Sequence, residues 1–232
     1  MAGIVYLIPI ALAEDGYHVL PTYLTGKIQQ CSVFFAENIR TARRAFRKMD
    51  SKFDIDSREW HETGSAEEEK IALFINCLQE NKTIGIVSES GCPGIADPGQ
   101  VLIAHAHRAN AIVKPLSGPS SIFLALMASG MNGQQFSFNG YLPIATSERT
   151  QKIKELERKV LHDNYTQLFI ETPYRNNQLL NALISTCQPN IKLCIAFNLT
   201  AEDEWVKTKS MAEWKKEIIE LPKSPAIFLI GN

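Results

Sequence analysis

Residues Val87 to Gly99 read VSESGCPGIADPG, a run with three glycines and two prolines. It directly follows Thr83–Val87, a β-branched run that is typical of a buried strand. Glycines let a ligand approach main-chain N–H and C=O groups, and ligands of open α/β sheets gather at the carboxyl ends of strands. The run therefore predicts a ligand-binding loop, although a tight structural connection fits its spacing equally well. It is neither GxGxxG nor a P-loop, which disfavours a dinucleotide or Walker-type site.

The sequence on both sides of this loop alternates between β-branched runs and helical patterns. Such alternation predicts βαβ units around a mostly parallel sheet. A capping-box spacing of Ser65 and Glu68 predicts a helix that ends near Asn81. The expected strands of the first half are Ile4–Ile8, Ser32–Phe35, Thr83–Val87 and Ala111–Val113.

The second half repeats this style after a Pro/Gly-rich junction. Its patterns predict helices at Ser120–Ser129 and Thr150–Leu161, and strands at Gln167–Ile170, Leu193–Phe197 and Ala226–Ile230. The fold class is therefore α/β with two lobes, each a sheet flanked by helices. We expect an N-terminal α/β domain over 1–115 and a C-terminal α/β domain over 116–232.

Composition and charge exclude several classes of protein. Of the 232 residues, 45% are hydrophobic and 21% are charged, which favours a globular fold over disorder. A net charge of −1 argues against a whole-surface affinity for nucleic acid or an anionic membrane. The five cysteines form no CxxC pair, which predicts no metal site and a reducing cytoplasm. The apolar stretch Gly3–Ala13 has no basic residue before it and contains Pro9, so we expect a buried strand rather than a signal peptide or a membrane span.

A second loop, PLSGPSS over Pro115–Ser121, brings hydroxyl groups to the start of an apolar helix. Ser120 or Ser121 can cap that helix. Free N–H groups at a helix start can also hold a carboxylate or phosphate, and the two interpretations are compatible.

These loops belong to an ordered set of motifs. The set also contains GYLP over Gly140–Pro143, ETPYR over Glu171–Arg175, AENIR over Ala36–Arg40, and the pair His61-Glu62. Together the motifs resemble the tetrapyrrole-methylase superfamily, specifically its ribosomal RNA small-subunit methyltransferase I branch. That branch has VSDAGTPGISDPG, PLPGPSA, GFLP, ESPHR, AEDTR and HNE in the same order and spacing, so the resemblance covers nearly the whole chain.

The resemblance implies a methyltransferase with S-adenosylmethionine as cofactor, which binds in a cleft between two α/β domains. It also implies a homodimer, ribosomal RNA or the small ribosomal subunit as partner, and methylation of a ribose 2′-hydroxyl. Glu37 and Glu89 lie in matching motifs and are the expected catalytic residues. The expected cofactor-binding residues are Ile10, Ser90, Gly91, Cys92, Ile95, Ser120, Ser121, Glu171, Asn198, Leu199, Pro225 and Ala226.

The chain departs from the branch pattern mainly outside the cofactor loops. Ile8–Ala13 replaces PTPIGN, Asn38 replaces an acidic residue, Phe197–Ala201 replaces RELTK, and Ser224-Pro225 replaces a late GE. Two alternatives therefore stay open. One is a methyltransferase that acts on a tetrapyrrole or another small molecule, and the other is a non-catalytic cofactor-binding protein of the same fold.

Candidate substrate contacts come from charged side chains. A ribose hydroxyl would gain from a base that accepts its proton, and Glu37, His61 and Glu89 are candidates, each also readable as a solvated surface group. Basic residues recur at helical spacing opposite an apolar stripe, which gives a helix with a basic face. The expected substrate-binding residues are Arg40, Arg43, Arg44 and His61. A second helix with Lys152, Lys154, Arg158 and Lys159 also carries Glu155 and Glu157, which is typical of an ordinary solvated surface.

Overall fold

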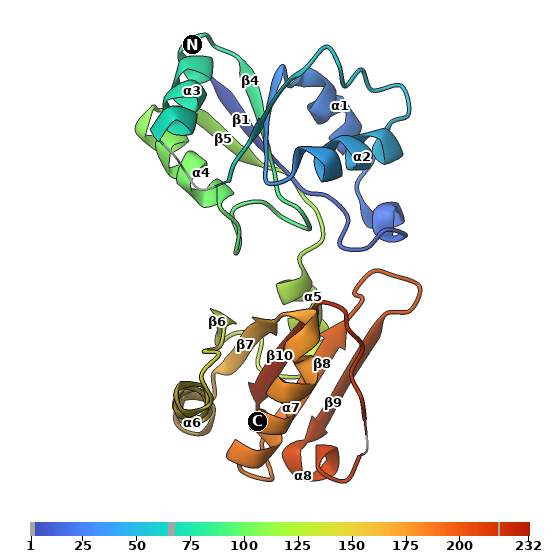
Figure 1. The fold of residues 1–232 in the computed structure, drawn as a ribbon, viewed down its shortest axis with the longest axis vertical. Helices are drawn as coiled ribbons and strands as arrows, with labels where there is room; N and C mark the ends of the chain where they lie inside the picture. Colours follow the sequence, from blue (N-terminus) through green and yellow to red (C-terminus); the bar gives the residue numbers. More distant parts are fainter. Residues whose placement is uncertain (1–2, 65–67, 218) are drawn as a thin grey trace. The chain divides into compact units, whose positions relative to one another are not determined.

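The computed structural model describes residues 3–64, 68–217 and 219–232. The chain divides into two compact units: unit 1 ends at Ser120 and unit 2 begins at Ser121. Each unit contains one five-stranded sheet flanked by helices (Figure 1). The α/β fold class with two lobes is confirmed. The capping-box residue Ser65 lies outside the described residues.

The sheet of unit 1 is parallel throughout, with the strand order β3-β2-β4-β1-β5. All five strands therefore end at the same edge of the sheet. The strands are β1 (Ile4–Ile8), β2 (Val33–Ala36), β3 (Glu59–Glu62), β4 (Thr83–Val87) and β5 (Ile112–Pro115).

Helices cover both faces of this sheet (Figure 1). Alternate side chains of a strand point to opposite faces, so Phe34 packs with α1 and α2 while Phe35 packs with α3 and α4. The helices are α1 (Tyr23–Gln30), α2 (Ile39–Met49), α3 (Glu68–Gln79) and α4 (Gly99–Arg108), with the short 3-10 helix η1 (Gly16–Val19) before α1.

The sheet of unit 2 has the order β6-β7-β10-β8-β9 and mixed directions. β6 and β7 are parallel, and the other neighbouring pairs are antiparallel. The strands are β6 (Phe136–Tyr141), β7 (Thr166–Glu171), β8 (Lys192–Phe197), β9 (Trp205–Ser210) and β10 (Ala226–Gly231).

The main core of unit 2 lies between this sheet and the helices α6, α7 and α8. α5 packs against β8, β9 and β10. The helical elements are α5 (Ser121–Ser129), α6 (Thr146–Asp163), η2 (Pro173–Arg175), α7 (Asn176–Thr186) and α8 (Met211–Trp214).

Every strand that the sequence patterns predict is present, and β1 and β4 have the predicted bounds. Three further strands, β3, β6 and β9, lack a long apolar run. Each is an edge strand whose residues are mostly half-buried. Half-exposed edges carry polar side chains such as those of EWHE and WVKTKS, which explains why an apolar pattern does not reveal them. Over the described residues, no helix combines the length and the apolar character needed to cross a bilayer.

Candidate functional site

The loops with the most unusual sequence meet at the carboxyl edge of the unit 1 sheet. They follow β1, β4 and β5 and cover residues 9–15, 88–98 and 116–120. In an open parallel sheet this edge is where ligands bind.

The loop after β4 is shaped by its own polar groups. The buried Ser88 hydroxyl donates to the carbonyls of Ser90 and Gly91, at 3.1 Å in both cases. Gly91 and Gly94 have φ values of +69° and +83°, a left-handed conformation that favours glycine. The turn therefore depends on the glycines that mark the sequence motif.

Asp97 closes the same loop. Its Oδ1 accepts hydrogen bonds from the backbone N–H groups of Gly94, at 2.9 Å, and Gly99, at 2.8 Å. Burial raises the pKa of the Asp97 carboxyl above its usual value, the two N–H groups lower it, and the Glu37 carboxylate raises it further. The net effect is a raised pKa for a side chain that holds the loop together.

Contacts between the loops bring several predicted cofactor-binding residues together. The Ile10 N–H donates to the Gly91 carbonyl at 3.0 Å, which joins the loops after β1 and β4. The Cys92 thiol donates to the Pro119 carbonyl at 3.3 Å, which joins the loops after β4 and β5. Burial raises the pKa of this thiol, so it stays protonated and able to donate.

A glycine allows close contact between the loops after β1 and β5. A Cβ on Gly118 would lie 2.2 Å from the Cβ of Pro9, so only glycine lets the loops after β1 and β5 approach this closely. Ser120 ends this loop and Ser121 begins α5, and both are half-buried. Ser90 and Ile95 are exposed.

The two predicted catalytic residues, Glu37 and Glu89, are joined at this edge by a hydrogen bond from the backbone of one to the side chain of the other. The Glu89 N–H donates to Glu37 Oε2 at 2.9 Å, and the Glu37 N–H donates to the Val87 carbonyl at 3.0 Å. These bonds fix the residue after β2 against the loop after β4.

Predicted residues of unit 2 gather at one end of its own sheet. Ala226 begins β10 and pairs with Glu171 at the end of β7 and with Phe197 at the end of β8. Asn198 directly follows β8 in a left-handed conformation, φ +51°, and donates to Asp203 Oδ2 at 2.7 Å. Leu199 is buried and Pro225 is exposed.

Glu171 is only 4% exposed and has protein partners. Its Oε1 accepts hydrogen bonds from the Thr172 N–H and from two guanidinium nitrogens of Arg175. This motif residue therefore also organises the turn from β7 into η2.

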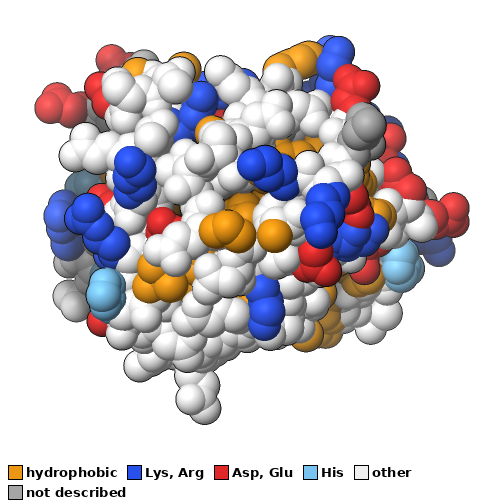
Figure 2. Space-filling view, turned by 90° about the horizontal axis from the view of Figure 1, so that it is seen from below, with side chains coloured by type: hydrophobic (Ala, Val, Ile, Leu, Met, Phe, Trp, Pro, Cys, Tyr) orange, Lys and Arg blue, Asp and Glu red, His pale blue; other side chains and the backbone are white. Residues whose placement is uncertain are grey.

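The predicted basic face of α2 is partly compensated by acidic side chains. Arg43 forms an ion pair with Asp56, and Arg44 forms one with Glu14 at 2.9 Å. Arg40 is exposed. The face in Figure 2 has Lys and Arg side chains scattered among Asp and Glu, in agreement with the net charge of −1.

His61, the fourth predicted substrate contact, lies on the edge strand β3. Its Nε2 lies 3.2 Å from Glu59 Oε1, and its ring packs against Phe35. Lys82, whose Nζ is 2.9 Å from Glu59 Oε2, is the main cause of the lowered pKa of Glu59.

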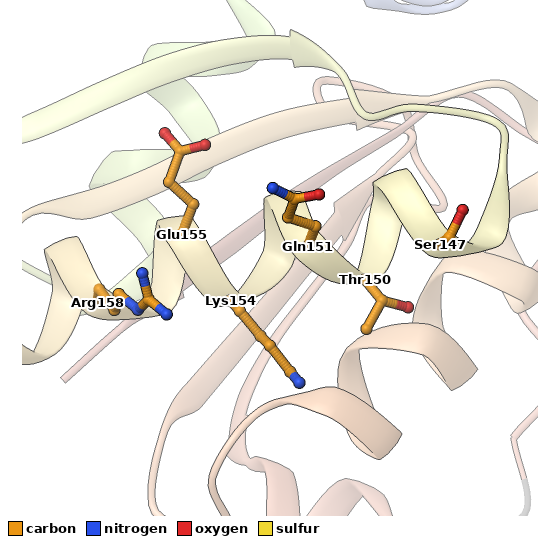
Figure 3. Close-up of a pocket in the computed structure, with 6 residues that line it drawn as sticks. All are labelled: Ser147, Thr150, Gln151, Lys154, Glu155 and Arg158. Carbon is orange, nitrogen blue, oxygen red and sulfur yellow. The ribbon is translucent and has the colours of Figure 1, made fainter.

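A hollow of about 420 Å³ lies over one side of α6 (Figure 3). It contains none of the predicted site residues. It is lined by Ser147, Thr150, Gln151, Lys154, Glu155 and Arg158. No group of three or more His, Cys, Asp or Glu side chains in the described parts of the chain could hold a metal ion.

Three structural residues of these sites were not singled out from the sequence. Asp97 carried a signal, because an Asp two residues before a loop glycine often bonds to that N–H. Tyr23, whose hydroxyl accepts a hydrogen bond from the Ser117 N–H at 2.7 Å, carried none. Asn176 also carried none, since its partners, the carbonyls of Pro222 and Ser224, lie far along the chain.

Comparison with known proteins gives a family model and named relatives. The model of the tetrapyrrole (corrin/porphyrin) methylases matches residues 26–214. A Vibrio cholerae protein named ribosomal RNA small subunit methyltransferase I is 28% identical over 79% of this chain. Proteins of the same name from Buchnera aphidicola and Leptospira borgpetersenii are 27% and 26% identical over 93% and 100% of the chain. The alignments cover 63%, 73% and 89% of these three relatives, so the chain spans less than two thirds of the first.

Solved structures share the fold at low sequence identity. The methyltransferase CobJ aligns with a TM-score of 0.65 and 16% identity, over 100% of this chain and 95% of its own. The uroporphyrin-III C-methyltransferase from Thermus thermophilus, complexed with S-adenosylhomocysteine, aligns with a TM-score of 0.60 and 14% identity, over 99% and 98%. At these identities the likeness shows the fold alone.

Proposed function

The chain belongs to the tetrapyrrole methylase family, and we propose that it transfers a methyl group from S-adenosylmethionine to a ribose 2′-hydroxyl of small-subunit ribosomal RNA. The observation that carries this proposal is the meeting of the motif loops in unit 1, where hydrogen bonds join Ile10 to Gly91 and Cys92 to Pro119. The named relatives supply the substrate class.

The residues at this edge fit S-adenosylmethionine. Gly91 and Gly94 leave the backbone of this loop uncovered. Any side chain at Gly91 would be strained by the φ of +69°, and its Cβ would also crowd the Pro119 carbonyl at 3.2 Å. Ser90 offers an exposed hydroxyl, and Ile95 offers an apolar side chain that is 44% exposed and that a bound adenine ring would cover. Main-chain N–H and C=O groups and hydroxyls can bind the polar groups of this cofactor, and apolar surface can pack against its adenine ring.

The cofactor would be held in a cleft between the two α/β domains, whose expected bounds of 1–115 and 116–232 place the border five residues before that of the compact units at Ser120. Unit 1 would supply the loops after β1, β4 and β5, and unit 2 the sheet end at Glu171, Asn198 and Ala226. The complete proposed set is Ile10, Ser90, Gly91, Cys92, Ile95, Ser120, Ser121, Glu171, Asn198, Leu199, Pro225 and Ala226.

The chemistry demands positioning more than covalent catalysis. S-adenosylmethionine supplies a methyl group on a sulfonium, and its transfer is an in-line displacement. Glu37 is held by the Glu89 N–H through Oε2, and its second oxygen would accept the proton of the ribose hydroxyl. Glu89 is the other candidate for this role. Arg40, Arg43, Arg44 and His61 would contact the RNA.

The same proposal includes a cytoplasmic homodimer that acts on ribosomal RNA or on the small subunit. The free thiols of all five cysteines support a reducing compartment.

A second candidate function is methylation of a tetrapyrrole or another small molecule. The changed first loop, Ile8–Ala13, favours it, because this loop lies beside the cofactor loops through Ile10 and would contact the acceptor. The structural likeness to uroporphyrin-III C-methyltransferase is compatible with it.

Calorimetry tests the cofactor site. We expect S-adenosylmethionine and S-adenosylhomocysteine to bind the wild-type protein, and Ser120→Trp to abolish binding because the indole fills the proposed cleft. Ser51→Trp, at an exposed turn of unit 1, is the matched control and should bind normally. Absence of binding to the wild type would refute the enzyme assignment.

Labelled-methyl transfer then separates the two functions. Incorporation into undermethylated small ribosomal subunits supports the RNA substrate and refutes the small-molecule alternative. Incorporation only into a porphyrinogen pool would reverse that conclusion, and cofactor binding with no turnover on either pool would indicate a non-catalytic binding protein.

A further inference from the structure

α6 carries two neighbouring polar stripes with different charge. Residues spaced by three or four positions share one side of a helix. The first stripe, here called the donor stripe, consists of Ser147, Gln151, Lys154 and Arg158 and contains no acidic residue. The second stripe consists of Glu148, Lys152, Glu155 and Lys159, and its charges balance.

Two acidic side chains of α6, Glu155 and Glu157, have partners outside the donor stripe. Glu155 forms ion pairs with Lys152 at 3.0 Å and with Lys159 at 3.6 Å. Glu157 is only 8% exposed, and its Oε1 accepts a hydrogen bond from the Gln188 N–H at 2.6 Å. The near-neutral charge count of the helix therefore conceals an uncompensated basic stripe.

The cations of the donor stripe face solvent. Lys154 and Arg158 are both exposed, and within the described residues neither forms an ion pair with a carboxylate. Figure 3 shows the Lys154 side chain directed away from Glu155. The hollow of about 420 Å³ over this side is lined by both cations and by Glu155, whose charge is offset by its ion pairs with Lys152 and Lys159.

The basic face of α2 is partly neutralised by acidic neighbours, whereas neither cation of the donor stripe forms an ion pair within the described residues. On α2, Arg43 is paired with Asp56 and Arg44 with Glu14. Arg40 and Arg47 of α2 are exposed and form no ion pair among the described residues, so α6 is a second surface with unpaired cations beside that of α2.

The donor stripe also begins at the end of unit 2 where the predicted cofactor residues lie. β6 leads directly into α6, and Tyr141 at the end of β6 pairs with Ile170, beside Glu171. Ser147 therefore lies near the sheet end that holds the predicted cofactor residues of unit 2. From there to Arg158 the stripe extends about 17 Å, at about 1.5 Å per residue.

We propose that the donor stripe binds successive backbone phosphates of the RNA substrate. This inference rests on the proposed function and assigns part of its substrate surface. Lys and Arg side chains, together with Ser and Gln, are the usual contacts to phosphate oxygens, and such contacts set the position of the RNA without reading its sequence.

The test compares two double variants that remove the same charge from the same helix. Lys154→Gln/Arg158→Gln changes the donor stripe, and Lys152→Gln/Lys159→Gln changes the balanced stripe. Each is titrated with a fluorescent single-stranded RNA copied from small-subunit ribosomal RNA, over a series of salt concentrations. Loss of two phosphate contacts should lower the slope of log K against log salt by about 1.4, because each contact to a single strand contributes about 0.7.

We expect the balanced-stripe variant to keep a slope close to that of the wild type, because Lys152 and Lys159 already share Glu155. The conservative variant Lys154→Arg/Arg158→Lys should bind as the wild type does. Calorimetry with S-adenosylhomocysteine should give the same affinity for all variants, which excludes misfolding as the cause.

Equal losses of slope in the two double variants would overturn the proposal, because net charge alone would then explain binding. So would an unchanged slope in the donor-stripe variant while the wild type methylates small subunits, a result that leaves the proposed function intact. A wild type that binds the cofactor but neither binds nor methylates RNA would overturn both.

Discussion

At the scale of single residues, the Asp97 carboxylate holds both sides of the loop after β4. We expect Asp97→Ala to lower the free energy of unfolding by about 1–3 kcal/mol, because it leaves the N–H groups of Gly94 and Gly99 without their partner. Asp97→Asn keeps an acceptor oxygen and should cost much less. Urea unfolding of both variants measures the difference, and equal costs would show that the charge matters more than the hydrogen bonds.

The raised pKa of Asp97 also predicts how the stability difference between the wild type and Asp97→Asn depends on pH. Burial and Glu37 raise the pKa of Asp97 above its ordinary value of 3.8, so the native state binds the proton more tightly than the unfolded chain. Between the ordinary and the raised pKa, this group makes the free energy of unfolding fall as pH rises. Asp97→Asn should lack this contribution, so its stability relative to the wild type should increase with pH across that interval.

At the residue level, the sequence motifs predicted which loops come close together. Ile10, Gly91 and Cys92 were assigned to one site, and in unit 1 hydrogen bonds join Ile10 to Gly91 and Cys92 to Pro119 across three loops. Tyr23 could not be found in this way, because its partner Ser117 is far away in the sequence and only the packing of α1 brings the two together. The role of the candidate residues in binding stays a prediction.

At the scale of elements, the start of α7 is hydrogen-bonded to the loop that leads into β10. Asn177 exchanges two hydrogen bonds with Leu221, at 2.8 Å and 3.2 Å, and Asn176 donates to the carbonyls of Pro222 and Ser224. This loop holds Ser224-Pro225, where the chain departs from the family pattern. The helix therefore fixes the position of Pro225 and Ala226.

We expect Asn176→Ala to cost about 1–3 kcal/mol of unfolding free energy, because the side chain is 1% exposed and its partners lose a buried donor. It should also weaken S-adenosylhomocysteine binding several-fold through displacement of Pro225 and Ala226. Gln178→Ala, on the exposed side of α7, is the control. If calorimetry gave Asn176→Ala an unchanged affinity for S-adenosylhomocysteine, these hydrogen bonds would serve stability alone.

Local sequence patterns predict the central strands but not how the strands of unit 2 pair. Central strands such as β1 and β4 are buried on both faces. Their sequences are therefore nearly continuous apolar, β-branched runs, which can be recognised without the structure. The antiparallel pairing of β10 with β7 and β8 is set by which strands share a core, and no local pattern encodes that choice.

At the scale of the whole molecule, each unit has its own hydrophobic core, and the three tryptophans report on them separately. Trp60 packs in unit 1, while Trp205 and Trp214 pack in unit 2. Fluorotryptophan labelling would therefore follow both units by fluorine NMR without further substitution. Ile84→Val and Ile195→Val are matched changes at fully buried strand positions of unit 1 and unit 2.

Without cofactor, we expect each substitution to cost about 0.5–1.5 kcal/mol in its own unit only. In urea titrations, Ile84→Val should then lower the unfolding midpoint that the Trp60 signal reports. Ile195→Val should lower the midpoint that the Trp205 and Trp214 signals report. A cofactor held by residues of both units stabilises them together, so S-adenosylhomocysteine at about 100 times its Kd should add about 2.7 kcal/mol and merge the transitions of the two units into one. If only the Trp60 transition moved on addition of the ligand, the cofactor would be bound by unit 1 alone, and the residues at the sheet end of unit 2 would have no part in the site.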